Sequence, residues 1–170
     1  MKIIYHCYGG NHSSVTAAAV HLGKLPQNRL PTAGELLSLE LFDKQGSRDI
    51  GKIIKVGTDG WGNDVFVVGR LSRPQILFNM FRGLGEQFEI APEDYILVDV
   101  GMLVNNTMRV GGLLSRGFGL INIGRPLVIR GTISDYQKIC DLVSKIKNGL
   151  QNGRKFATYA HYIFCPEVSH

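Results

Sequence analysis

The residues with the clearest chemical potential lie close to the start of the chain, where positions 9–14 read Gly-Gly-Asn-His-Ser-Ser. An apolar segment at 2–7 precedes them and an alanine-rich segment follows. A strand, a glycine turn, hydroxyl residues and a helix in this order are typical of phosphate sites in α/β proteins. The first turn of a helix has unpaired N–H groups and a partial positive charge, and glycine lets the backbone approach an anion closely. We therefore predict a phosphate-binding loop whose ligand contacts come from Gly9, Gly10, Asn11, Ser13 and Ser14.

His12 lies roughly where a P-loop would carry its lysine. The match is partial, because no earlier glycine has the P-loop spacing, and no G-x-G-x-x-G of a dinucleotide fold is present. An imidazole can act as an acid, a base or a phosphate ligand near neutral pH. We predict His12 as a catalytic or ligand-contacting residue.

Cys7 ends the first apolar segment, and five residues separate it from Ser13. This is the position of a phosphatase nucleophile, but such loops carry arginine where this chain has Ser13. A thiol before a helix N-terminus can be an activated nucleophile, and a buried free cysteine is also a common core residue. Both interpretations stay open. A zinc site from His6, Cys7 and His12 with His161 and Cys165 is not predicted, because the usual ligand spacings are absent.

A second glycine pair, Gly111-Gly112, precedes Ser115 with the spacing that separates Gly9-Gly10 from Ser13. If both pairs follow strands, two helix starts face one ligand, and Arg116 supplies the cation that the first loop lacks. Chance is the alternative, because 21 glycines make such pairs common. We predict Ser115 and Arg116 as ligand contacts, ahead of Arg109 and Arg130.

Asp99 ends the apolar segment that starts at Tyr95 and resembles the acidic residue after a Walker B strand. We predict that it holds a metal or a water molecule if the protein transfers phosphoryl groups.

Elements that position these residues can be assigned from the apolar patterns and turn residues. Strands are expected at 2–7 and 95–100, a β-hairpin at 53–57 and 64–69, and a short strand at 126–129. Helices are expected at 13–22, after a Thr32 capping box, at 74–88, at 111–122, and after a cap at Ser134 or Asp135.

Apolar strands that alternate with helices predict a mainly parallel sheet covered on both faces. The fold class is therefore a three-layer α/β/α sandwich with an added β-hairpin, in a single domain over 1–170. Ligands of such sheets bind beyond the carboxyl ends of the strands, where the Gly9-Gly10 loop begins.

Composition favours a globular protein of the cytoplasm, since 44% of the 170 residues are hydrophobic and 19% are charged. No signal peptide or membrane span is predicted, and three cysteines fit a reducing compartment. The net charge of +5 comes from scattered basic residues, which does not favour nucleic acid as the partner.

The residues 1–10, 12–14, 17–23 and 25–26, with 111–112, 114–116 and 123–128, resemble an uncharacterised family of small proteins from spore-forming Gram-positive bacteria, classed as a domain of unknown function. The resemblance covers most of residues 1–148. It implies a bacterial, cytoplasmic protein linked to sporulation and brings no activity, cofactor or catalytic residue.

The expected function is binding of a phosphorylated small molecule or nucleotide, with phosphoryl transfer or hydrolysis as the reaction if there is one. The alternative is a non-catalytic interaction or structural protein, in which the glycine pairs only let helices pack closely on the sheet.

Overall fold

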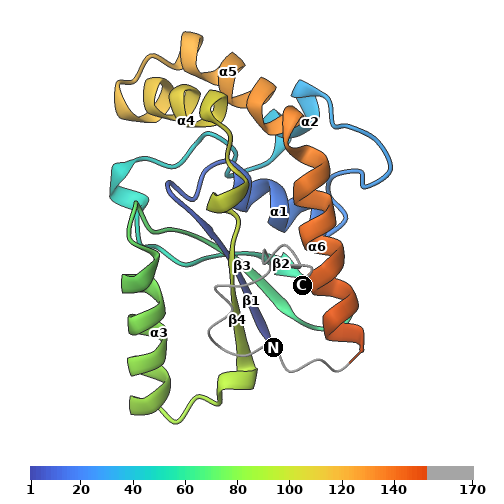
Figure 1. Cartoon of the computed structure of the whole chain (residues 1–170), viewed down its shortest axis with the longest axis vertical. Helices are drawn as coiled ribbons and strands as arrows, with labels where there is room; N and C mark the ends of the chain where they lie inside the picture. Colours follow the sequence, from blue (N-terminus) through green and yellow to red (C-terminus); the bar gives the residue numbers. More distant parts are fainter. Residues whose placement is uncertain (153–170) are drawn as a thin grey trace, which may run out of the picture.

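The computed structural model describes residues 1–152, which form a mixed four-stranded sheet with helices on both faces (Figure 1). The main elements are β1 (Lys2–Cys7), α1 (Ser13–His21), α2 (Ala33–Ser38), β2 (Ile54–Thr58), β3 (Asp64–Gly69), α3 (Pro74–Gln87), β4 (Tyr95–Asp99), α4 (Asn106–Gly112), α5 (Ile121–Ser134) and α6 (Tyr136–Gln151). Short helical turns are η1 (Ser47–Asp49), η2 (Pro92–Asp94), η3 (Gly101–Leu103) and the π-helical η4 (Leu113–Gly117).

The strand order is β2-β3-β1-β4, and β1 pairs in parallel with both β3 and β4. Antiparallel pairing of β2 with β3 confirms the predicted hairpin. The predicted α/β fold class is also confirmed. The three parallel strands point the same way, so β1, β3 and β4 end at Cys7, Gly69 and Asp99 on the same side of the sheet. Helices α4 and α5 cover that end of the molecule (Figure 1).

Side chains of β1 alternate between two apolar cores, because successive residues of a strand point to opposite faces. Ile3 and Tyr5 pack in the larger core with α1 and α6, while Ile4 packs in the smaller core with α3 (Figure 1). This is why β1 has an apolar residue at consecutive positions rather than an alternating pattern.

The hairpin turn is tied to the first helix by a buried chain of polar groups. Asp59 Oδ2 lies 3.1 Å from His21 Nε2, and His21 Nδ1 lies 2.7 Å from the Tyr5 hydroxyl. A carboxylate only accepts, so Nε2 carries the proton, and Nδ1 of the neutral ring accepts from Tyr5. Burial lowers the pKa of His21 and outweighs the opposite effect of Asp59.

Because the pKa of His21 is lowered, we expect the folded chain to lose stability in mildly acidic solution. The unfolded chain binds a proton at His21 near pH 6.5, whereas the folded chain binds it only at lower pH. The free energy of unfolding should therefore fall as the pH decreases below about 6.5, by up to about 1.4 kcal/mol per pH unit. Urea unfolding between about pH 5 and 7 checks this, and His21→Asn should flatten the dependence. An unchanged slope in His21→Asn would rule out His21 as its source.

The structure differs from the sequence-based assignment between residues 106 and 134. The predicted helix at 111–122 is divided, because α4 ends at Gly112, η4 follows, and α5 begins at Ile121. The predicted strand at 126–129 is wrong, since these residues lie inside α5. Asp135 precedes α6 as expected, but its carboxylate accepts from Asn105 N and Lys138 Nζ instead of capping the helix.

Close packing of α4 on α5 explains why Pro126 is tolerated in a helix. A Cβ atom on Gly111 would lie 2.7 Å from Val128 N, and one on Gly124 would overlap the backbone of Ser115. Only glycine allows the two backbones to approach this far. The packing gained across this contact offsets the hydrogen bond that proline cannot donate.

Candidate functional site

The loop after β1 connects a strand to a helix, as its sequence predicts, but it is tightly enclosed. Gly10 has a φ of 70°, and a Cβ atom there would lie 2.7 Å from Gly69 N. Cys7 is buried, its Sγ accepts from Gly10 N at 3.2 Å, and Ser14 Oγ lies 3.1 Å from it. Ser13 is 1% exposed, and its Oγ makes no hydrogen bond to any described residue.

The segment 43–45 covers this loop. Asn11 and Gln45 exchange two hydrogen bonds, of 2.9 and 2.7 Å, and Gln45 Nε2 donates to Gly10 O at 2.6 Å. Asp43 N donates to Asn11 O at 3.1 Å. Asn11 is therefore committed to holding the covering segment.

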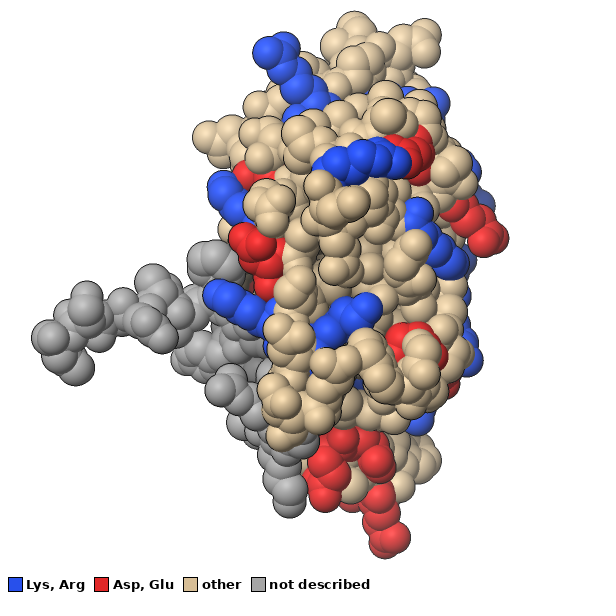
Figure 2. Space-filling model, turned by 90° about the vertical axis from the view of Figure 1, so that its right-hand side faces the viewer, with Lys and Arg blue, Asp and Glu red and all other residues tan. Residues whose placement is uncertain are grey.

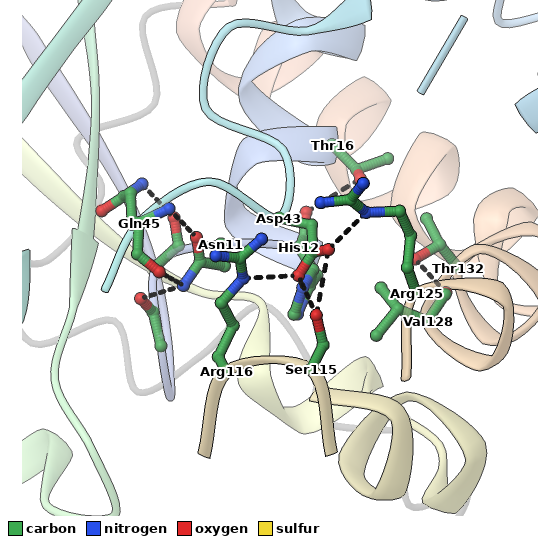
Figure 3. Close-up of polar contacts among 12 residues, drawn as sticks. Asn11, His12, Thr16, Asp43, Gln45, Ser115, Arg116, Arg125, Val128 and Thr132 are labelled. Atoms are coloured by element: carbon green, nitrogen blue, oxygen red, sulfur yellow. Dashed lines mark hydrogen bonds and ion pairs between the residues drawn. The ribbon is translucent and has the colours of Figure 1, made fainter. Parts of the chain in front are cut away.

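Asp43 is the centre of the polar network beside the loop (Figure 3). Its carboxylate accepts from Ser115 Oγ at 2.9 and 3.0 Å, from Arg116 Nε at 2.8 Å and from Arg125 Nε at 2.8 Å. His12 Nε2 lies 3.2 Å from the same group. The Asp43 side chain is fully buried and its backbone has a φ of 52°, which is uncommon for a residue other than glycine.

The charges of this network favour an ionised Asp43. Burial alone would raise its pKa, but the hydrogen bonds from His12, Arg116, Arg125 and Ser115 hold the pKa of this carboxyl well below its usual range. One carboxylate faces two guanidinium groups, so the cluster keeps an excess of positive charge. Arg116 and Arg125 each use only Nε among the described residues, and their side chains are 23% and 36% exposed.

Three of the predicted site residues meet here. His12, Ser115 and Arg116 all contact Asp43, and Arg116 points toward the first loop as the two-loop hypothesis requires (Figure 3). The structural basis given for that hypothesis is wrong, because Gly111-Gly112 ends a helix and does not follow a strand. A Cβ atom on Gly112 would lie 3.4 Å from the His12 ring, so this glycine makes room for His12.

Asp99 belongs to a different cluster, with Arg70 and His6. Arg70 Nη2 lies 2.9 Å from both Asp99 oxygens, and Arg70 Nε donates to His6 Nδ1 at 3.1 Å. Gly101 N also donates to Asp99, at 2.8 Å. A metal or water at Asp99 would therefore compete with Arg70.

Sequence reasoning did not select Asp43, Arg125, Gln45 or Arg70 as site residues. A usable signal exists for Arg125: residues 100–134 contain Arg109, Arg116, Arg125 and Arg130 and no aspartate or glutamate. Nothing in the local sequence distinguishes Asp43, which acts through contacts with residues more than 70 positions away.

Two surface cavities lie away from these clusters. One, of about 610 Å³, is lined by Ser72–Ile76 and Asn79 at the start of α3. The other, of about 370 Å³, is lined by residues of α1, β2 and the segment 38–41. Within residues 1–152, no group of three or more His, Cys, Asp or Glu side chains has a metal-binding arrangement, and His161 and Cys165 lie outside the described residues.

The fold and the cluster define an α/β protein with a basic helical cap over the carboxyl ends of its parallel strands. The chain belongs to the family described as "Protein of unknown function (DUF3189)", whose model matches residues 2–148. No curated protein and no solved structure matches it. None of the helices within residues 1–152 has the length and apolar character needed to cross a membrane.

Proposed function

We propose that this protein binds a phosphorylated small molecule or a nucleotide beside the Gly9–Ser14 loop, where Arg116 is the main cationic contact. The observation that carries the proposal is the arrangement of Arg116 and Arg125 around Asp43. A guanidinium held through Nε keeps both Nη groups for a second anion, and two such groups can grip a phosphate with charge-assisted hydrogen bonds. Asp43 then orients the arginines and limits their mutual repulsion.

Two further features support an anionic ligand. The cap formed by residues 100–134 has four arginines and no acidic residue. The Ser13 hydroxyl, at the start of α1, is buried and has no hydrogen-bond partner among the described residues. We assign Ser115 and His12 to the same site through their contacts with Asp43.

Phosphoryl transfer or hydrolysis is the reaction that we would test at this site. In this reaction His12 and Arg116 would stabilise negative charge on the transferred group. Cys7, held by Gly10 N and Ser14 Oγ, is the candidate nucleophile, and Asp99 would have to leave Arg70 to hold a metal or water. Release of p-nitrophenol from p-nitrophenyl phosphate, lost in Cys7→Ser, would support this reaction.

A specific observation favours the alternative, a non-catalytic interaction protein. The loop is covered by Gln45, and Gly10 packs directly on Gly69. In this alternative the glycines serve close packing, and the buried ion pairs only fix the helical cap.

Thermal unfolding with phosphate compounds separates the two functions. Inorganic phosphate, AMP and ATP are each added at equal ionic strength, with sodium chloride as the reference. A compound that binds the folded chain raises Tm as its concentration increases. At 100 times the Kd, the free energy of unfolding is higher by about 2.7 kcal/mol. A saturable rise with at least one compound is expected. If no compound raises Tm above the sodium chloride reference, the interaction protein is favoured.

We also propose a cytoplasmic location in a spore-forming Gram-positive bacterium. Its support is the resemblance of the opening residues to that family, together with Cys7 and Cys140, which are both free and buried as in a reducing compartment.

A further inference from the structure

Helix α3 covers one face of the sheet and leaves an apolar stripe exposed on its own outer side. Leu77 and Phe78 pack in the core with Ile4 and Leu97, whereas another set of α3 residues stays in solvent. This set, which we call the α3 stripe, is Ile76 (55% exposed), Met80 (55%), Leu84 (47%) and Phe88 (68%). Residues spaced by four form one continuous ridge along a helix, and such a ridge is the usual element of helix-to-helix packing.

Charged residues of opposite sign stand at the two ends of the stripe. Arg73 precedes the helix, and Glu89 follows Phe88 at the other end of the stripe. Both are exposed, and their side chains make no hydrogen bond or ion pair with a described residue. Glu86 and Arg82, four residues apart, lie on another side of the helix, because Glu86 is about 200° around it from Leu84. On the side of the molecule that faces away from α3, acidic side chains gather at the lower end (Figure 2).

We propose that the α3 stripe is a self-association surface that binds the α3 stripe of a second copy in an antiparallel, two-fold arrangement. In this arrangement Arg73 of each copy lies beside Glu89 of the other, so the charges at both ends are complementary. The dipoles of the two antiparallel helices also point in opposite directions, so the positive end of each lies beside the negative end of the other. A two-fold contact uses the same patch on both copies, and a patch with its two charges at opposite ends is complementary to itself.

The cavity at the start of α3 supports the same arrangement. It is lined by Ser72–Ile76 and Asn79, so it opens at the Arg73 end of the stripe. Phe88 of the second copy would reach that end, because antiparallel helices bring the last residue of one stripe to the first residue of the other. A largely exposed aromatic ring and a cavity of about 610 Å³ therefore face each other.

A second exposed apolar set lies on the helical cap, at Val110, Leu113, Phe118, Leu120 and Ile123. It suits a second copy less well. Residues 100–134 carry four arginines and no acidic residue, so two caps would repel each other. The charges therefore favour the α3 stripe for self-association.

A contact made by one helix from each copy is smaller than the about 800 Å² per partner of a standard interface, so the dimer should be reversible and depend on concentration. Sedimentation equilibrium of the full chain, from about 1 to 500 µM, should show the mass rise from one copy toward two. Met80→Glu should weaken association at least tenfold. The matched control Ile123→Glu, at a position 58% exposed on α5, should leave it unchanged.

A charge exchange tests the antiparallel geometry. Arg73→Glu alone and Glu89→Arg alone should each weaken association several-fold, and the two changes together should restore it. These surface changes lie outside the phosphate site, so the phosphate-induced rise in Tm should stay as in the unchanged chain. A chain that remains monomeric over the whole range contradicts the proposal and points to a different protein as the partner. Equal weakening by Met80→Glu and Ile123→Glu, or no recovery in the double variant, also contradicts it.

Discussion

Replacement of Asp43 by alanine should lower the free energy of unfolding by about 3 kcal/mol. The change leaves Arg116, Arg125 and His12 close together without the carboxylate that they share. Removal of one partner from a buried ion pair costs about 3–5 kcal/mol, and we expect the lower end because water reaches both arginines. Urea unfolding near neutral pH measures the effect.

Two further variants make this prediction specific. Asp43→Asn retains hydrogen-bond acceptance but removes the charge, so it should be less destabilising than Asp43→Ala. Asp141→Ala removes an exposed carboxylate on α6 that accepts one hydrogen bond from Gln137, and it should change stability by less than about 0.5 kcal/mol. Similar values for Asp43→Ala and Asp141→Ala would show that the network contributes little.

The same carboxylate should make the folded chain sensitive to strong acid. Its pKa is lowered in the folded state, so its stabilising contribution is present above the unfolded value of 3.8 and is lost as the pH falls below it. This window lies well below that of His21, so the two contributions can be separated in one pH series.

Arg116→Ala should weaken binding of the phosphate compound that stabilises the protein by about 1.5–3 kcal/mol, which corresponds to roughly ten- to a hundredfold in Kd. The loss arises because Arg116 would supply a charge-assisted hydrogen bond to the ligand. Isothermal titration measures the affinity. The fold should persist, because Asp43 keeps Arg125, His12 and Ser115.

Arg130→Ala is the matched control for Arg116. Arg130 is exposed on α5 and makes no ion pair with a described residue, so its loss should change the affinity by less than about threefold. Arg116→Lys should recover only part of the affinity, because lysine keeps the charge but lacks the planar fork. Equal affinities for Arg116→Ala and Arg130→Ala would place the ligand elsewhere.

Local patterns were sufficient to predict the four strands of the sheet and most of the helices. The apolar segments at 2–7 and 95–99 have both faces buried, and the capping box at Thr32 forms with Glu35 as its spacing predicts. The helical cap was harder to predict, because its structure depends on contact between α4 and α5. The segment 126–129 has two β-branched residues, which favour a strand locally, and a proline, which disfavours a helix interior, but packing around Gly111 and Gly124 makes it helical.

The candidate site was predictable in its parts but not in its centre. His12, Ser115 and Arg116 were selected for their residue types and spacing, and the structure brings them to one carboxylate. That carboxylate, Asp43, lies in a turn without a motif. Its partners come from α1, η4 and α5, so only the folded chain identifies it (Figure 3).

The most direct test of the phosphate site is a titration followed by NMR of the arginine Nε–H groups. Signals of Arg116, Arg125 and Arg70 are assigned by substitution, and the protein is titrated with the phosphate compound that raises Tm. We expect saturable shifts of the Arg116 and Arg125 signals at one common Kd, while the Arg70 signal, which belongs to the Asp99 cluster, stays unchanged. Saturable binding that leaves the Arg116 and Arg125 signals in place would contradict it.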